Sequence, residues 1–158
     1  KEPAAILSEC NVSLQNSFEK VTFITINLVR FDLQNRMLIF SRSGHTPALF
    51  YQKEQGGCLE LSPRGMALGL ANFSQDGIEE LRLPYRSGDI LFFFSDGLSE
   101  IMNEDEAMLG VASLRGMLVE YADLSALEIK EKIMARAIAF AAGQANADDL
   151  TFVVMKVR

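Results

Sequence analysis

The sequence predicts an α+β fold in which antiparallel β-sheets are covered by helices on their outer faces. Short apolar or alternating segments separated by turn residues fill the first two thirds of the 158 residues, as expected for strands. Helical periodicity dominates the last third, and one more strand-like segment closes the chain. The length fits a single domain over residues 1–158 with no internal boundary, and an apolar content of 49% is enough for a substantial core.

Most of the predicted strands lie in the first part of the chain, after a helix that apolar spacing places at residues 3–15. Turn residues separate these strands, which cover residues 21–32, 37–44, 48–52, 58–62, 78–85 and 90–94. The first strand is rich in β-branched residues and apolar on both faces, which favours an inner strand covered on both sides. It forms a hairpin with the second strand, because only the turn Leu-Gln-Asn-Arg separates them.

The last third of the chain contains two predicted helices and the closing strand. The first helix is expected within residues 101–122, after a loop. The second opens after Ser125, which forms a capping box with Glu128, and it ends near residue 142. Residues 150–157 return as a strand, so the helical layer is followed by one more sheet element.

The charge and hydropathy of the chain exclude two classes of partner. The formal net charge is −6, and no cluster of Lys and Arg stands out, which argues against nucleic acid because phosphate binding needs a basic surface. No apolar run approaches the ~18 residues that a membrane span requires, so no membrane contact is expected in this segment.

The two cysteines, Cys10 and Cys58, are too few for a disulfide framework and are not spaced for zinc. Both lie in apolar patterns, which indicates two buried thiols in a reducing cytoplasm. Cys58 and Arg64 have the spacing of the cysteine phosphatases, whose loop must bind phosphate through successive N–H groups. The intervening residues alternate like a strand, lack a glycine and include Pro63, so we do not expect this chemistry.

Two acidic positions at the ends of predicted strands are candidates for chemistry. Asp96 and Gly97 follow the apolar strand 90–94, and glycine there lets the backbone turn sharply and present the carboxylate at the sheet end. Asp148 and Asp149 precede the last strand, and their mutual repulsion favours a nearby cation. Taken alone, Asp96 and Gly97 are better explained as a plain Asp-Gly turn, and Asp148 and Asp149 are equally well explained as a polar loop. If the two strands are neighbours, the carboxylates converge into a site for Mg²⁺ or Mn²⁺.

The only histidine, His45, lies in the segment Ser-Gly-His-Thr-Pro-Ala after the second predicted strand. A histidine in such a loop can act as a general acid or base. The simpler interpretation, which we favour, is that its hydrogen bonds hold the turn.

The order of motifs resembles the stage II sporulation protein E-like branch of the metal-dependent type 2C protein serine/threonine phosphatases. The matching pieces are PAAILSECNVSL, FITINLVRFD, SGHTPALFY, GMALGL, LPYRSGDILFFFSDGLSE, MLG and ADDLTFVVMKV, in this order. Each piece is unspecific alone, and their order and spacing carry the resemblance. It implies a two-sheet sandwich with helices on both outer faces, in the order α-β-β-α.

The resemblance also implies a site with two Mn²⁺ or Mg²⁺ ions. Their activated water would hydrolyse phosphoserine or phosphothreonine without a covalent enzyme intermediate. The family's Asp-Gly motif falls on Asp96 and Gly97, and its C-terminal acidic motif on Asp148 and Asp149. Asp96 and Asp148 are then the expected metal ligands, whereas Gly97, Asp149 and His45 would support the site. No catalytic residue is expected beyond the metal ligands.

One departure from the family pattern affects the expected activity. The family's Gly-Asp-x-x-Asp-like and Asp-x-x-Gly-His-Gly segments, whose carboxylates help hold the ions, do not occur in residues 1–158. The sequence also begins with Lys1 and reads at once as helix. We therefore expect the C-terminal portion of a phosphatase domain, incomplete at its N-terminus and inactive alone. Sheet edges left exposed by the missing strands would favour self-association.

Three functional hypotheses follow from these observations. The first is a bacterial, cytoplasmic signalling phosphatase whose substrate is a phosphorylated regulatory protein of the anti-sigma-factor antagonist type, as the resemblance implies. The second is a catalytically inactive phosphatase-like module that binds a regulatory partner. The third is a generic α+β binding domain whose acidic turns hold no metal.

Overall fold

The computed structural model describes residues 1–15, 22–70, 77–144 and 148–158. The chain forms two compact units. Unit 1 comprises residues 1–47 and 61–85, and unit 2 comprises residues 48–60 and 86–158. Each unit contains one antiparallel sheet and at least one helix, so the predicted α+β class is confirmed.

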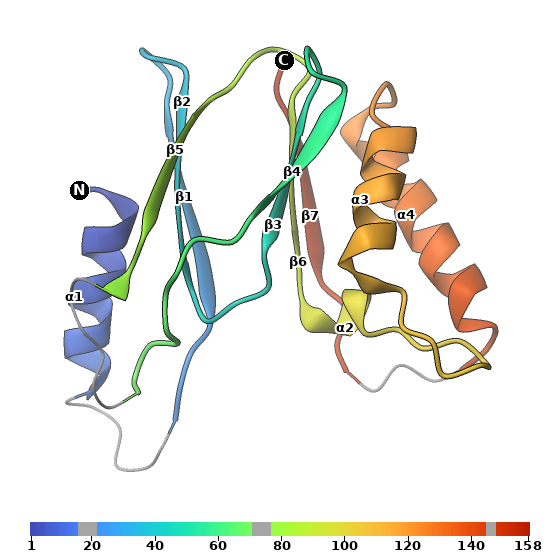
Figure 1. Ribbon diagram of the computed structural model, residues 1–158, viewed down its shortest axis with the longest axis horizontal. Coiled ribbons are helices and arrows are strands. Elements are labelled where there is room, and N and C mark those ends of the chain that lie inside the picture. The colour runs from blue at the N-terminus through green and yellow to red at the C-terminus, as the bar shows by residue number, and fades with distance from the viewer. Residues whose placement is uncertain (16–21, 71–76, 145–147) are drawn as a thin grey trace. The chain divides into compact units, whose positions relative to one another are not determined.

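Unit 1 is a three-stranded sheet with a helix on one face. Its strands are β1 (Ile26–Asp32), β2 (Met37–Ser43) and β5 (Glu80–Pro84), in the spatial order β1-β2-β5. Helix α1 (Pro3–Gln15) lies along this sheet and buries Leu7 against it (Figure 1). The predicted helix at 3–15 and the predicted hairpin of β1 and β2 are both confirmed.

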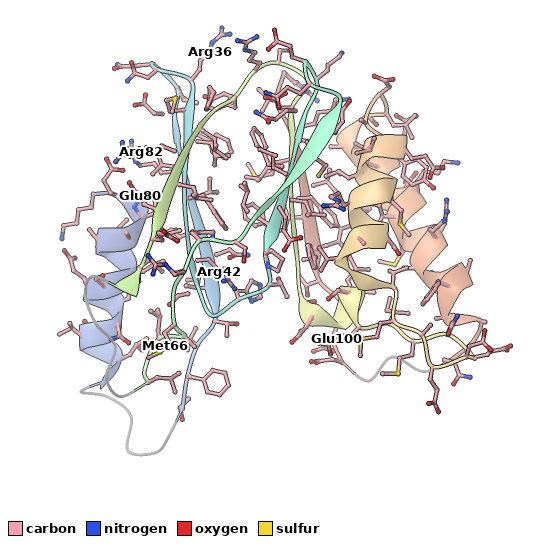
Figure 2. All side chains as sticks on the ribbon, in the orientation of Figure 1. Arg36, Arg42, Met66, Glu80, Arg82 and Glu100 are labelled. Atoms are coloured by element: carbon pink, nitrogen blue, oxygen red, sulfur yellow. The ribbon has the colours of Figure 1, made fainter. Side chains whose placement is uncertain are left out.

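Ion pairs fix the N-terminal end of α1 to the sheet. The Glu2 carboxylate accepts hydrogen bonds of 2.8 and 3.0 Å from Arg30 Nη2 and also pairs with Arg82 at 3.3 Å. Arg82 contacts Glu80 of the same strand at 2.8 Å (Figure 2). Because these charged groups are partly solvated, they orient the helix more than they stabilise the fold.

The prediction of an inner, fully covered strand at residues 21–32 is wrong. Strand β1 begins only at Ile26, forms an edge of the three-stranded sheet, and is half-buried at all seven positions. The run of β-branched and apolar residues indicated a strand correctly. Position within a sheet depends on pairing with distant segments, which such a run does not encode.

Unit 2 is a four-stranded sheet with two long helices on one face. Its strands are β3 (Ala48–Gln52), β4 (Gly57–Leu61), β6 (Ile90–Phe94) and β7 (Phe152–Lys156), ordered β4-β3-β6-β7. The short helix α2 (Asp96–Ser99) directly follows β6. Helices α3 (Gly110–Glu120) and α4 (Ala126–Ala141) cover the sheet (Figure 1).

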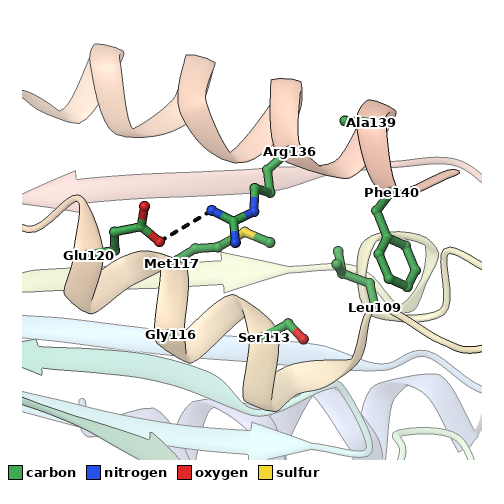
Figure 3. Close-up of a pocket in the computed structure, with 8 residues that line it drawn as sticks. All are labelled: Leu109, Ser113, Gly116, Met117, Glu120, Arg136, Ala139 and Phe140. Carbon is green, nitrogen blue, oxygen red and sulfur yellow. Dashed lines mark hydrogen bonds and ion pairs between the residues drawn. The ribbon is translucent and has the colours of Figure 1, made fainter. Parts of the chain in front are cut away.

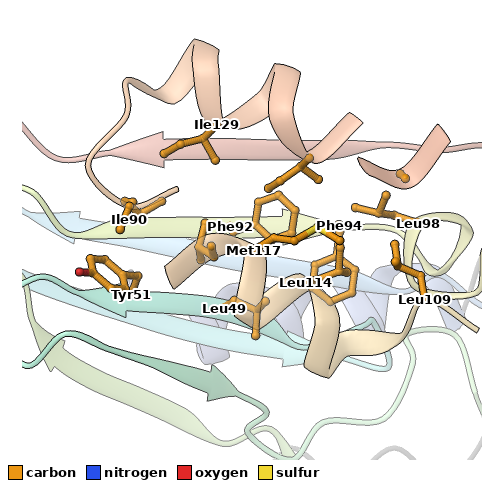
Figure 4. Packing of buried hydrophobic residues seen from close by; sticks show 14 of the residues in the cluster. Leu49, Tyr51, Ile90, Phe92, Phe94, Leu98, Leu109, Leu114, Met117 and Ile129 are labelled. Carbon is orange, nitrogen blue, oxygen red and sulfur yellow. The ribbon is translucent and has the colours of Figure 1, made fainter. Parts of the chain in front are cut away.

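Strand β6 contributes two buried phenylalanine side chains to the core of unit 2. Phe92 and Phe94 stack with ring centroids 5.5 Å apart (Figure 4). Phe92 also contacts Phe152 of β7, with ring centroids 5.6 Å apart. Buried residues of the two helices complete this core, among them Leu114, Met117, Ile129, Ile133 and Ala137. Aromatic pairs add about 0.5–1.5 kcal/mol each beyond their burial, so the end of β6 has a firmly fixed position.

The turn between α3 and α4 is held at both of its ends. The capping box predicted at the start of α4 is present, with Glu128 N–H donating to Ser125 Oγ and Ser125 N–H donating to the Glu128 carboxylate. Lys156 of β7 donates 2.7 Å hydrogen bonds to the carbonyls of Ala122 and Leu124.

Of the helices that the structure describes, none is both long and apolar enough to span a bilayer.

Candidate metal centre at the ends of strands β6 and β7

The two predicted acidic positions lie at the same end of the unit 2 sheet. Strands β6 and β7 are antiparallel neighbours, with Phe94 opposite Phe152. Asp96 follows the end of β6, and Asp148 and Asp149 precede the start of β7. From the sequence, the carboxylates are expected to converge only if these two strands are neighbours. The pairing of β6 with β7 confirms that the strands are neighbours.

Ser95 joins the two segments beyond the last paired residues of the strands. Its backbone N–H donates to Thr151 O at 2.8 Å. Its hydroxyl donates to Asp149 O at 3.1 Å and accepts from Thr151 N–H at 3.0 Å. Ser95 occupies the N-cap position of α2, but its side chain makes no bond to that helix. The serine therefore acts as a clamp between the two acidic segments.

Gly97 brings the backbones of these segments into direct contact. A Cβ atom placed on Gly97 would lie 2.4 Å from Asp149 O, closer than real Cβ atoms approach, and 3.0 Å from Asp149 C. The sequence interpretation gave a different reason for this glycine, namely a sharp backbone turn. Gly97 instead lies within helix α2, and glycine is required there because the backbone of Asp149 leaves no space for a Cβ atom.

The carboxylates of Asp96 and Asp148 have similar local surroundings. Asp96 Oδ1 accepts the N–H of Gly97 at 3.0 Å, and Asp148 Oδ1 accepts the N–H of Asp149 at 2.7 Å. All three aspartates of the site are exposed. In each of these two carboxylates, a backbone N–H orients Oδ1, and Oδ2 does not accept that hydrogen bond.

The donor set fits a hard divalent cation in type but is not complete. Carboxylate oxygens are the preferred ligands of Mg²⁺ and Mn²⁺, and both ions also accept water and phosphate oxygens. Within the described parts of the chain, however, no group of three His, Cys, Asp or Glu side chains is close enough to hold an ion. Metal binding by Asp96 and Asp148 stays a prediction, and further donors would be needed for full coordination.

His45 is held in the turn after β2 in unit 1, whereas the aspartates belong to unit 2. Its Nδ1 lies 3.0 Å from Thr25 Oγ1, and its carbonyl accepts a 2.6 Å hydrogen bond from Arg42. Arg42, labelled in Figure 2, also donates to the carbonyl of Pro63. These bonds agree with a histidine that holds the turn, and a supporting role in the metal site stays a prediction.

Sequence reasoning missed Ser95 and Thr151 as parts of the site. The available signal was a serine immediately before Asp96, in a position where it looks like a helix cap. Its actual partners, Asp149 and Thr151, are distant in sequence, so pairing of β6 with β7 had to be known first.

The cysteines differ from the expectation that both are buried. Cys10 is exposed on α1, where the apolar spacing of the helix had placed it on the covered face, and Cys58 is half-buried. Burial raises the pKa of the Cys58 thiol to about 11, although Arg115 opposes this shift. A thiol with such a pKa is almost entirely protonated at neutral pH, which argues against a role as a phosphatase nucleophile.

Alkylation with iodoacetamide at pH 8 is expected to modify Cys10 well before Cys58 in the folded protein. The thiolate is the reacting form, and at pH 8 a pKa of about 11 leaves it roughly a thousandfold less populated than the thiol. Peptide mass spectrometry over time measures both rates. Equal rates in the folded state, compared with the urea-unfolded control, would contradict this assignment.

Comparisons with known proteins agree with the fold and with the motif order. The family model described as "Stage II sporulation protein E (SpoIIE)" matches residues 1–158. The phosphoserine phosphatase RsbU of Bacillus subtilis (strain 168) is 24% identical over 155 residues. The SiaA-PP2C domain of Pseudomonas aeruginosa superposes over 99% of the chain with a TM-score of 0.85 and 22% identity. The manganese-presoaked phosphatase domain of SpoIIE from Bacillus subtilis covers 96%, with a TM-score of 0.68 and 21% identity.

The chain corresponds to only part of each of these proteins. It spans 45% of RsbU, 61% of the SiaA chain and 63% of the SpoIIE chain. The structural matches establish the fold alone, which is an α+β domain with two antiparallel sheets and helices.

Proposed function

Because this chain belongs to the stage II sporulation protein E (SpoIIE) family, we propose that it is part of a metal-dependent protein phosphatase. Its reaction would be hydrolysis of phosphoserine or phosphothreonine on a regulatory protein. Water attacks phosphorus, the bond from phosphorus to the side-chain oxygen breaks, and that oxygen leaves as a hydroxyl with inorganic phosphate as the second product.

In the proposed site, Asp96 and Asp148 are ligands of Mn²⁺ or Mg²⁺. A bound ion of this kind supplies water that is nucleophilic at neutral pH and neutralises charge on the phosphoryl oxygens. Asp96 and Asp148 provide fixed carboxylate oxygens, and Asp149 supports Asp148 through its N–H. Two ions are expected in a complete site, with further carboxylates from the acidic segments that the family carries and that residues 1–158 lack.

The observation that carries this proposal is the direct contact between Gly97 and the backbone of Asp149, closed by the hydrogen bonds of Ser95. This contact leaves no room for a side chain on Gly97. A polar connection of this kind is well suited to holding two carboxylates at a fixed separation, which a metal ion requires.

The proposed substrate is a phosphorylated regulatory protein of the anti-sigma-factor antagonist type, and the proposed location is the bacterial cytoplasm. The name of the relative RsbU, a phosphoserine phosphatase, supports the chemical class.

Asp148→Asn and Asp149→Asn separate a ligand from a supporting residue in this proposal. In the full-length protein, Asp148→Asn is expected to lower Mn²⁺-dependent phosphate release by more than about 100-fold. Asp149→Asn keeps the backbone N–H that supports Asp148 and is expected to change release less than about twofold. Release is measured with p-nitrophenyl phosphate over a Mn²⁺ titration. Full activity of Asp148→Asn would exclude it as a ligand.

A second candidate function is a catalytically inactive phosphatase-like module that binds a regulatory partner. The observation in its favour is that the described residues gather no set of three metal-binding side chains. Calorimetric titration of the full-length protein with Mn²⁺ separates the two. Saturable binding abolished by Asp96→Asn supports the phosphatase, and no binding at millimolar Mn²⁺ supports the inactive module.

A further inference from the structure

A short hairpin, residues 101–109, leads from α2 to α3 and presents an ordered, exposed tip. Met102 and Met108 pair across it, and Leu109 N–H donates to Ile101 O at 2.8 Å. The side chain of Asn103 accepts the N–H groups of Asp105 and Ala107 at 3.1 and 2.9 Å. Buried Ile101 and Leu109 anchor its two ends in the core of unit 2. The hairpin is therefore preorganised.

The exposed side chains of this hairpin combine apolar and acidic character. Met102 and Met108 are 46% and 56% exposed. From Asp96 to Leu114 the chain has five acidic residues and no basic one; the acidic residues are Asp96, Glu100, Glu104, Asp105 and Glu106. No ion pair within the described residues neutralises Glu104, Asp105 or Glu106. The hairpin therefore presents negative charge that attracts cationic groups, next to the exposed apolar side chains of Met102 and Met108.

A groove between α3 and α4 continues from the hairpin. Its volume is about 570 Å³, and Leu109, Met117 and Phe140 form its apolar walls (Figure 3). The ion pair between Glu120 and Arg136, at 3.3 Å, lies at one end. Leu109 is the last residue of the hairpin and also lines the groove, so the groove begins where the hairpin ends.

Gly116 of α3 lines this groove, and neither its backbone conformation nor its neighbours require a glycine there. It has no positive φ, and a Cβ atom placed there would meet nothing within 4 Å. Glycine inside a helix costs about 1 kcal/mol relative to alanine. Since no contact within the described structure offsets that cost, the open space beside Gly116 is available for a close approach from outside.

We propose that the hairpin 101–109 and the groove beside it form a docking surface for a basic, amphipathic segment of the protein's phosphorylated partner. An apolar side chain of that segment enters the groove, and its Lys or Arg side chains face Glu104 and Asp105. The acidic tip repels phosphate, so the docked segment and the phosphorylated residue are separate parts of the partner. Identifying the segment as part of a substrate rests on the proposed function.

The test measures binding separately from catalysis. A fluorescent, unphosphorylated peptide with leucines on one helical face and lysines on the other is titrated with the full-length protein, and anisotropy gives the Kd. Glu104→Lys with Asp105→Lys is expected to weaken binding about tenfold, as is Gly116→Leu, which fills the groove. The control Glu60→Lys with Glu131→Lys makes the same charge change at other exposed positions and should change the Kd less than about twofold.

Catalysis is followed in the same variants with p-nitrophenyl phosphate, which is too small to need docking, and its hydrolysis should be unchanged. Binding of the lysine peptide without any phosphatase activity would overturn the proposed function and leave the docking surface supported. Unchanged Kd values in both variants, equal binding of a glutamate-for-lysine peptide, or a dimer whose interface covers the groove would overturn the docking surface.

Discussion

Replacing Gly97 with alanine is expected to lower the free energy of unfolding by about 2 kcal/mol and to abolish Mn²⁺-dependent phosphatase activity. The added methyl group would lie 2.4 Å from Asp149 O, so the segment before β7 has to move away from α2. Overpacking of this kind typically costs about 1–3 kcal/mol. The displacement also separates Asp148 from Asp96, and a metal site tolerates errors of only a few tenths of an ångström.

Gly116→Ala is the matched control for this substitution. It makes the same chemical change inside a helix of the same unit, at a position where the new Cβ meets nothing within 4 Å. We expect it to be neutral or to stabilise the protein by up to about 1 kcal/mol. Urea unfolding measures both variants. If Gly97→Ala matches Gly116→Ala in stability and in hydrolysis of p-nitrophenyl phosphate, the contact with Asp149 is not tight.

Asp96→Asn is expected to reduce Mn²⁺-dependent phosphate release by more than about 100-fold while leaving stability nearly unchanged. Asp96 is exposed, and its one local bond, from the N–H of Gly97, can also be accepted by an asparagine side-chain oxygen. Asparagine nevertheless lacks the negative charge that a divalent ion requires. Residues that merely orient ligands are worth about 10–100-fold, so loss of a ligand should exceed that range.

The combination of lost activity and preserved stability is what identifies a ligand here. Asp123→Asn, at an exposed turn after α3, removes the same charge elsewhere in unit 2 and should retain full activity. Activity is measured as kcat over a Mn²⁺ titration, together with the unfolding midpoint in urea. Wild-type kcat for Asp96→Asn at saturating Mn²⁺ would remove this carboxylate from the proposed site.

The fold class and most elements could be predicted from the sequence because their signals are local. The capping box of Ser125 and Glu128 and the apolar run of β6 involve only neighbouring residues, and both were predicted. The position of β1 at a sheet edge could not be predicted, because it depends on which distant segments pair with it. The same holds for Cys10, whose exposed position depends on the orientation of α1 on its sheet.

The candidate site was predictable as a set of residue types but not as a geometry. Asp96 and Asp148 stood out because carboxylates followed or preceded apolar strands. The reason for Gly97 was misjudged, since an Asp-Gly pair looks the same whether glycine supplies a turn or makes room for a distant backbone. Ser95 was missed because its partners across β6 and β7 appear only once the strands are paired.

The proposed function depends on Asp96 and Asp148 binding the same metal centre. The most direct measurement is a crystal structure of the full-length protein grown with Mn²⁺, in which anomalous scattering locates the ions. We expect manganese at the shared end of β6 and β7, with a carboxylate oxygen of Asp96 and one of Asp148 each about 2.1 Å from an ion. Manganese bound elsewhere, with neither carboxylate coordinated, would contradict it.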